Sequence, residues 1–98
     1  MDLSTPRDFR AGMKLEITLA DDSAKWVVIQ LVPAESDPSD PVGIISTPIQ
    51  VENRTVIVTL IRDYPRIVRI VVVGGEEAWH FRMGAGNGPA QIQTIRVL

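Results

Sequence analysis

Short segments that alternate apolar and polar residues recur along this chain. The clearest one, residues 13–19 (MKLEITL), has an apolar side chain at every second position. Successive side chains of a β-strand point to opposite faces, so this period predicts a strand with one buried face and one wet face. No window of about ten or more residues has helical spacing free of Gly, Pro or β-branched crowding. The sequence therefore predicts an all-β fold.

Further strand-like segments follow the first one. They span residues 26–32, 43–46, 49–51, 55–60, 67–73, 78–82 and 91–98. The polar residues 21–23 predict a hairpin between the first two strands, and residues 52–54 predict a second turn. Gly74 and Gly75 are expected to end the strand at 67–73. The proline-rich segment 33–41 is expected to form a surface loop within the domain.

Alternation also predicts which side chains face the core. The expected core residues are Val27, Ile29 and Leu31; Val56, Val58 and Leu60; and Val68, Ile70 and Val72. Trp26, Val28 and Gln30 fall on the outer face of their strand. The apolar period slips between Ile92 and Ile95, which a β-bulge near Thr94 would explain.

The length of 98 residues predicts one domain spanning residues 1–98. About seven or eight short strands without helical crossovers indicate antiparallel sheets. Two such sheets packed face to face would bury one face of every strand, as in a jelly-roll or immunoglobulin-like sandwich. We therefore expect an antiparallel β-sandwich.

Charge and composition exclude several partners. The net charge is −2 and the Lys and Arg residues are scattered, which argues against nucleic acid. The apolar runs are far shorter than the roughly 20 residues of a membrane-spanning helix. The chain has no cysteine for disulfides or thiolate chemistry. Its first residues lack the basic and apolar regions of a secretion signal. We expect a monomer.

Few residues of the chain suit catalysis. His80 is the single histidine, so a histidine-based metal or general-base site has no second member. The chain has no G-x-S-x-G nucleophile motif. The glycine-rich residues 84–89 precede a strand and lack the lysine of a phosphate-binding loop, so they predict a tight turn. We expect that the chain is not an enzyme.

Carboxylates offer a weak alternative. Glu76 and Glu77 are neighbours that would point to opposite faces of a strand, which suits a catalytic pair poorly. Together with Asp37 and Asp40 they could supply oxygen ligands for calcium, but solvated loop charges are the favoured interpretation. We expect no cofactor.

Aromatic residues are scarce, at 5%, so their positions are informative. An exposed indole can stack on the C–H face of a sugar ring, and amide or imidazole groups can bond its hydroxyls. The candidate ligand-binding residues are Trp26, Trp79, Tyr64, His80, Gln30 and Asn87. Core packing is the alternative for both tryptophans, and alternation favours exposure only for Trp26. For Tyr64, a loop anchor is the favoured interpretation over a ligand platform.

Residues 75–80 (GEEAWH) and 86–92 (GNGPAQI), on a small β-domain without catalytic residues, suggest a family. The chain resembles the carbohydrate-binding modules of bacterial family 5 endoglucanases, of the β-glucan-binding type known from soil metagenomes. The resemblance implies a secreted parent protein, in which the module holds a linked catalytic domain on β-1,4-linked or mixed-linkage glucan, or on xyloglucan. It implies stacking by Trp26 and Trp79, with Tyr64, His80, Gln30 and Asn87 as further contacts. The few aromatics favour a cleft for single chains over a crystal-surface strip.

Two other functions are consistent with the same sequence. A structural or protein-interaction spacer domain would have the same fold but would bind no sugar. A small glycoside hydrolase would need a suitably spaced pair of carboxylates.

Overall fold

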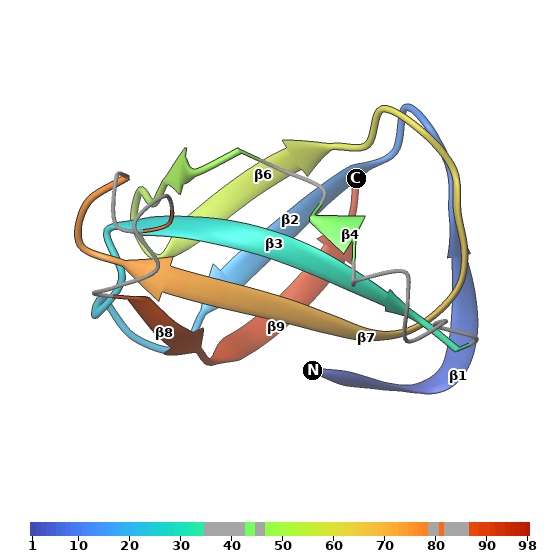
Figure 1. Cartoon of the computed structure of the whole chain (residues 1–98), viewed down its shortest axis with the longest axis horizontal. Coiled ribbons are helices and arrows are strands. Elements are labelled where there is room, and N and C mark those ends of the chain that lie inside the picture. The colour runs from blue at the N-terminus through green and yellow to red at the C-terminus, as the bar shows by residue number, and fades with distance from the viewer. Residues whose placement is uncertain (35–42, 45–46, 79–80, 82–86) are drawn as a thin grey trace.

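A computed structural model describes residues 1–34, 43–44, 47–78, 81 and 87–98. In this part of the chain, nine strands form two antiparallel sheets that pack against each other (Figure 1). The strands are β1 (Asp2–Phe9), β2 (Lys14–Leu19), β3 (Trp26–Pro33), β4 (Gly43–Ile44), β5 (Ile49–Gln50), β6 (Thr55–Thr59), β7 (Tyr64–Gly75), β8 (Asn87–Ala90) and β9 (Ile92–Val97). The predicted all-β, antiparallel sandwich is confirmed.

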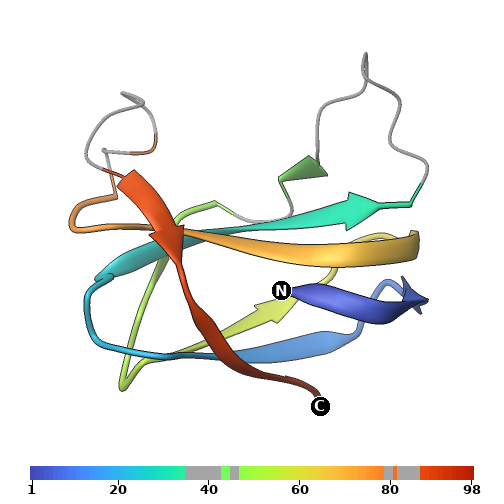
Figure 2. The ribbon, with the colours of Figure 1, turned by 90° about the horizontal axis from the view of Figure 1, so that it is seen from below.

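The two sheets differ in size. The larger sheet has the order β1-β7-β3-β4, with β5 also paired to β3 and β8 paired to β7. The smaller sheet has the order β6-β2-β9. Figure 2 shows the two layers edge on, with β3 and β7 in one layer and β2 and β6 in the other. Each sheet therefore presents one face to the core and one outer face.

The core lies between these layers. Its largest fully buried side chains are Phe9, Leu15, Ile17, Leu19, Ile29, Leu31, Ile67 and Ile70, together with Val27 and Val72. The predicted core faces of residues 26–32 and 55–60 are confirmed, since Val27, Ile29 and Leu31 are at most 1% exposed and Val56, Val58 and Leu60 at most 6%. Burial of such a side chain stabilises the folded state by about 1.5–3 kcal/mol relative to leaving it exposed.

The prediction for Val68 is wrong. Val68 is half-buried, whereas Ile67 is 2% exposed. The pairing of β3 with β7 changes from Val32 opposite Arg69 to Pro33 opposite Ile67, so Val68 is an extra residue in the ladder. An inserted residue reverses the faces of the residues before it, which turns Ile67 toward the core.

The predicted hairpin between residues 13–19 and 26–32 is also wrong. β2 pairs with β6 and β9, whereas β3 belongs to the other sheet. Residues 20–25 carry the chain from one layer to the other, and Ala24 on this crossing is buried. Alternation specifies the face that a strand buries but not which strand pairs with it. The pattern is therefore equally consistent with a β2–β3 hairpin and with β2 and β3 in different sheets.

The predicted bulge near Thr94 and the predicted turn at residues 52–54 are confirmed. β9 pairs Thr94 with Thr18 and then Ile92 with Leu19, which leaves Gln93 as the bulged residue. In the turn before β6, Asn53 and Arg54 have φ angles of 51° and 60°. Two consecutive positive φ angles are typical of a type I′ hairpin turn.

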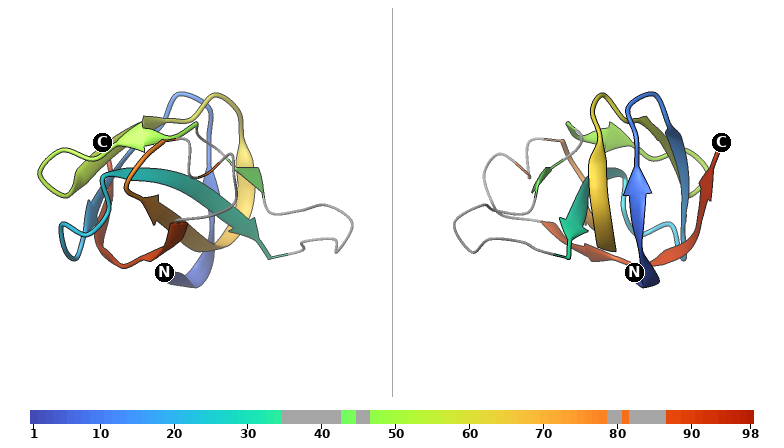
Figure 3. Two further views of the ribbon diagram at one scale, coloured as in Figure 1. Left: turned by 60° about the vertical axis from the view of Figure 1, so that its left-hand side comes forward. Right: turned by 90° about the vertical axis from the view of Figure 1, so that its right-hand side faces the viewer.

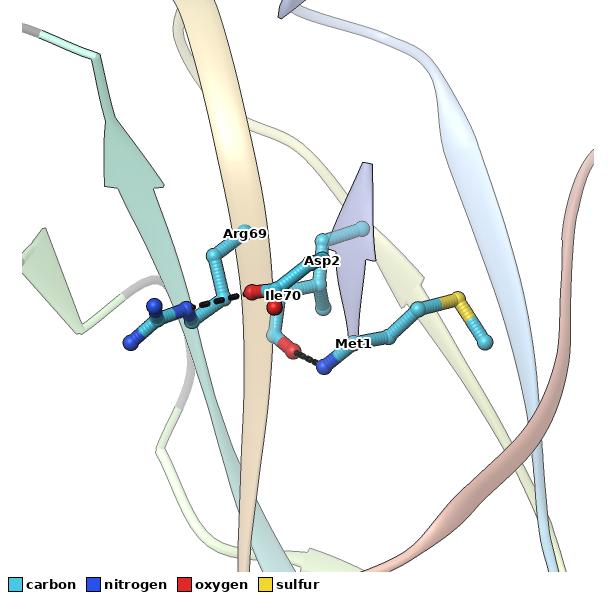
Figure 4. Close-up of polar contacts among 4 residues, drawn as sticks. All are labelled: Met1, Asp2, Arg69 and Ile70. Carbon is cyan, nitrogen blue, oxygen red and sulfur yellow. Dashed lines mark hydrogen bonds and ion pairs between the residues drawn. The ribbon is translucent and has the colours of Figure 1, made fainter. Parts of the chain in front are cut away.

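β1 was not expected from the sequence. It is the outer strand of the larger sheet beside β7 (Figure 3), where a proline such as Pro6 is tolerated. Its pairing with β7 is irregular. At its start, the Met1 amino group donates to the Ile70 carbonyl, and Arg69 Nε donates to the Asp2 carboxylate at 2.7 Å (Figure 4). These contacts hold β1 against β7, although the sequence of β1 does not alternate apolar and polar residues.

The expected strand at 78–82 is wrong for the residues that the structure describes. β7 ends at Gly75, as predicted, and neither Ala78 nor Phe81 lies in a strand. Trp79, His80 and Arg82 lie outside the described residues, as does most of the expected loop at 33–41.

Candidate functional site

The candidate site is the outer face of the larger sheet. Trp26, Val28 and Gln30 point to this face of β3, because the residues between them face the core. Trp26 and Gln30 are both partly exposed. The structure therefore places these two sequence-predicted residues on one surface, four positions apart, which corresponds to about 13 Å along the strand.

Strand pairing places other residues beside Trp26. Trp26 pairs with Gly75 of β7 on one side and with Gln50 of β5 on the other. Gly75 pairs in turn with Asn87 of β8. Directly opposed residues of antiparallel strands direct their side chains to the same face. Gln50, which is exposed, therefore lies next to Trp26, and the Asn87 backbone lies two strands away, at about 10 Å.

The surface between Trp26 and Gln30 is apolar. Val28, which is 6% exposed, pairs with Val73, and Gln30 pairs with Val71. These rows of β3 and β7 carry no charged residue until Arg69, which pairs with Val32 and binds Asp2. The result is an uncharged strip with a tryptophan at one end and glutamine amides along it.

Phe81 is a site residue that the sequence analysis did not assign. Its ring lies where a side chain on Gly75 would be: Cζ and Cε2 are 3.3 and 3.5 Å from the Cβ position of that residue. Gly75 is directly opposite Trp26, so the phenyl ring is on the same face as the indole. The only sequence signal was the Gly-Gly pair, which can mark a close approach of another group to a strand.

Tyr64 lies at the far end of the sheet. It begins β7, whereas Gly75 ends it, so the strand separates Tyr64 from the Trp26 end by roughly 30 Å. Tyr64 packs against the core, and its hydroxyl accepts a hydrogen bond from Arg62 Nε at 3.1 Å. This hydrogen bond raises the pKa of the Arg62 guanidinium. One sugar ring cannot contact both Tyr64 and Trp26.

Three candidate side chains cannot be placed. Trp79 and His80 lie outside the described residues, and Asn87 is described only through its backbone. Their ligand-binding roles stay predictions.

Two cavities in the described part of the chain are small. One of about 200 Å³ lies where residues 23–24 meet the ends of β7 and β8, and one of about 290 Å³ lies between β5 and β6. Sites that enclose a drug-sized ligand usually measure about 300–1,000 Å³.

Asp21 is the acidic group of the 20–25 crossing with a perturbed ionisation. Its carboxylate accepts hydrogen bonds from the Ser23 hydroxyl at 2.6 Å and from the Ser23 amide at 2.9 Å. The hydroxyl contact is the larger cause and the amide contact the second, and both lower the pKa of Asp21. This contact fixes the start of the segment that leads to Trp26.

We expect an NMR titration of Asp21 to have its midpoint below the ordinary aspartate value of about 3.9. The stabilisation from a lowered pKa is complete above the unfolded-state pKa and is lost as the pH falls through the folded-state pKa. Ser23→Ala removes the hydroxyl donor and should move the midpoint back up. An unchanged midpoint in Ser23→Ala would contradict the assigned cause.

The residues that the structure describes contain no group of three or more His, Cys, Asp or Glu side chains arranged to hold a metal ion. They also contain no helix of the length and hydropathy that crossing a membrane requires.

Comparisons of the chain with protein families, with curated proteins and with solved structures found no match. By its structure, the chain is an antiparallel β-sandwich with a partly exposed tryptophan on the outer face of its larger sheet.

Proposed function

We propose that the chain is a non-catalytic module that binds β-1,4-linked or mixed-linkage glucan on the outer face of the larger sheet. The observation that carries the proposal is the partly exposed Trp26 at the end of an uncharged strip of β3 and β7. A pyranose ring has an apolar C–H face that stacks on an indole. A neutral polysaccharide therefore matches this surface better than a charged ligand does.

The amides near Trp26 support the same class of ligand. Gln50 and Gln30 each offer both donors and an acceptor, as sugar hydroxyls require. Gln50 lies beside Trp26 and Gln30 lies further along β3. A glucan chain that follows β3 would meet the indole first and then, beyond the largely covered Val28, the second amide.

The biological role that we propose is targeting. In the family that the sequence resembles, such a module is linked to a glycoside hydrolase and concentrates it on its polysaccharide. We extend this role to the present chain, with xyloglucan as a further ligand and a secreted parent protein, and we propose that the module acts as a monomer.

Affinity gel electrophoresis tests the proposal. The native chain is run in gels that contain barley β-glucan, hydroxyethylcellulose or xyloglucan, beside a gel without polysaccharide. We expect retardation by at least one of these glucans and no release of reducing sugar. Unchanged mobility in all three gels would refute glucan binding, and release of sugar would identify a hydrolase.

One observation favours the alternative of a spacer domain. Val28 is only 6% exposed although it points away from the core, so other parts of the chain cover some of the outer face. A spacer or protein-interaction domain could use this face for structural packing alone. It would show no retardation on any glucan.

A further inference from the structure

We propose that Phe81 is a positioning residue that holds the Trp26 indole in place for ligand stacking, and that Gly75 lets the Phe81 ring lie close against β7. The proposal rests on the glucan-binding function proposed above. It adds a residue that neither alternation nor the resemblance assigned to the site.

The first step of the argument is the fit between Phe81 and Gly75. The nearest Phe81 atoms, Cζ and Cε2, lie 3.3 and 3.5 Å from the point where a Cβ on residue 75 would be. The first distance is tighter than most Cβ contacts, so a methyl group there would shift the ring by a few tenths of an ångström. At Gly75 the ring can therefore lie closer to the β7 backbone than it could at a residue with a side chain.

The second step is the position of Trp26. Directly opposed residues of an antiparallel pair have Cβ atoms about 4.5–5.5 Å apart. A ring seated over Gly75 therefore lies beside the Cβ atom from which the Trp26 indole projects. On its other side, Trp26 has the exposed Gln50 as its cross-strand neighbour. Trp26 thus has an aromatic ring over its partner on one neighbouring strand and an amide on the other, in keeping with its partial exposure.

The third step concerns binding. An indole that can rotate must be ordered when a ligand stacks on it, at a cost of about 0.5–1.5 kcal/mol for an immobilised side chain. A neighbouring aromatic ring removes part of this cost by holding the indole before the ligand arrives, and aromatic pairs contribute about 0.5–1.5 kcal/mol beyond the area that they bury. By holding the indole, Phe81 lowers the cost of stacking an uncharged pyranose ring on Trp26. Gln50 is then placed to bond to the hydroxyls of that ring.

Four variants of the full chain test this proposal: Phe81→Ala, Phe81→Leu, Gly75→Ala and Trp26→Ala. Affinity for barley β-glucan is measured in gels, and the NMR signal of the Trp26 indole N–H reports the environment of the ring. We expect Phe81→Ala and Gly75→Ala to weaken binding about fivefold and to shift this signal in the free protein. Phe81→Leu retains apolar volume and should recover part of the affinity. Gly88→Ala, which meets no atom within 4 Å, is the control and should bind normally.

The outcomes separate this inference from the proposed function. If Trp26→Ala loses binding while Phe81→Ala and Gly75→Ala bind as tightly as the wild type, the inference is wrong and glucan binding stands. If Trp26→Ala also binds normally, stacking on this face is wrong. If Phe81→Ala fails to fold, Gly75→Ala and Phe81→Leu decide, since normal affinity and an unmoved indole signal in both would overturn the positioning role.

Discussion

Gly74→Ala is expected to lower the free energy of unfolding by about 1–3 kcal/mol, the usual cost of overpacking a core. A Cβ on Gly74 would lie 2.7 Å from the Cβ of Ala24 and 3.4 Å from that of Ala90. The Ala24 methyl group cannot rotate away, because it is attached directly to the backbone. The added atom must therefore move the 20–25 crossing or β7. Urea unfolding followed by circular dichroism measures the change.

Gly88→Ala is the matched control for this prediction. Gly88 pairs with Gly74 on the neighbouring strand, but a Cβ there would meet nothing within 4 Å. Substitutions of this kind usually change stability by less than about 0.5 kcal/mol. Equal destabilisation by the two variants would show that the backbone freedom of glycine, and not contact with Ala24, makes Gly74 necessary.

Trp26→Ala is expected to reduce affinity for a soluble β-glucan by about tenfold or more. A stacked ring contributes on the order of 1 kcal/mol beyond its buried area, and a loss of about 1.4 kcal/mol is tenfold in affinity. Because the indole lies on the outer face, we expect the β-sheet circular dichroism to persist. Isothermal titration calorimetry with a mixed-linkage oligosaccharide measures the loss.

The control for Trp26→Ala lies on the opposite side of the sandwich. Ile57 is 52% exposed on β6 of the smaller sheet, so Ile57→Ala also removes an exposed apolar side chain. It should leave affinity unchanged. A similar loss in both variants would indicate nonspecific adhesion to apolar surface, and loss of folding in Trp26→Ala would mean that the indole is a structural residue.

Much of the fold follows from alternation, because a strand with one buried face shows its period directly. β2, β3 and β6 show this period in sequence, and the core residues predicted for β3 and β6 are buried as expected. The period does not specify partners, which is why β2 and β3 were wrongly joined in a hairpin. β1 has almost no buried face, so its eight residues gave no periodic signal.

The candidate site was predictable only in part. The outward direction of Trp26 and Gln30 follows from local alternation. The contact of Phe81 with Gly75 and the separation of Tyr64 from Trp26 depend on the path of the chain in space. Gln50 lies on a strand of two residues, which is too short to show a period. Local patterns therefore predicted which face of the strand carries the site, but not which residues from other parts of the chain belong to it.

The central claim is that glucan binds on the outer face of the larger sheet at Trp26, and chemical-shift mapping tests it most directly. Assigned ¹H–¹⁵N spectra of the chain are recorded while a soluble mixed-linkage β-glucan oligosaccharide is added. The account predicts the largest changes at the Trp26 indole and at the amides of Gln50, Val28 and Gln30, with the smaller sheet around Ile57 unaffected. Changes confined to the smaller sheet, or none at saturating oligosaccharide, would contradict it.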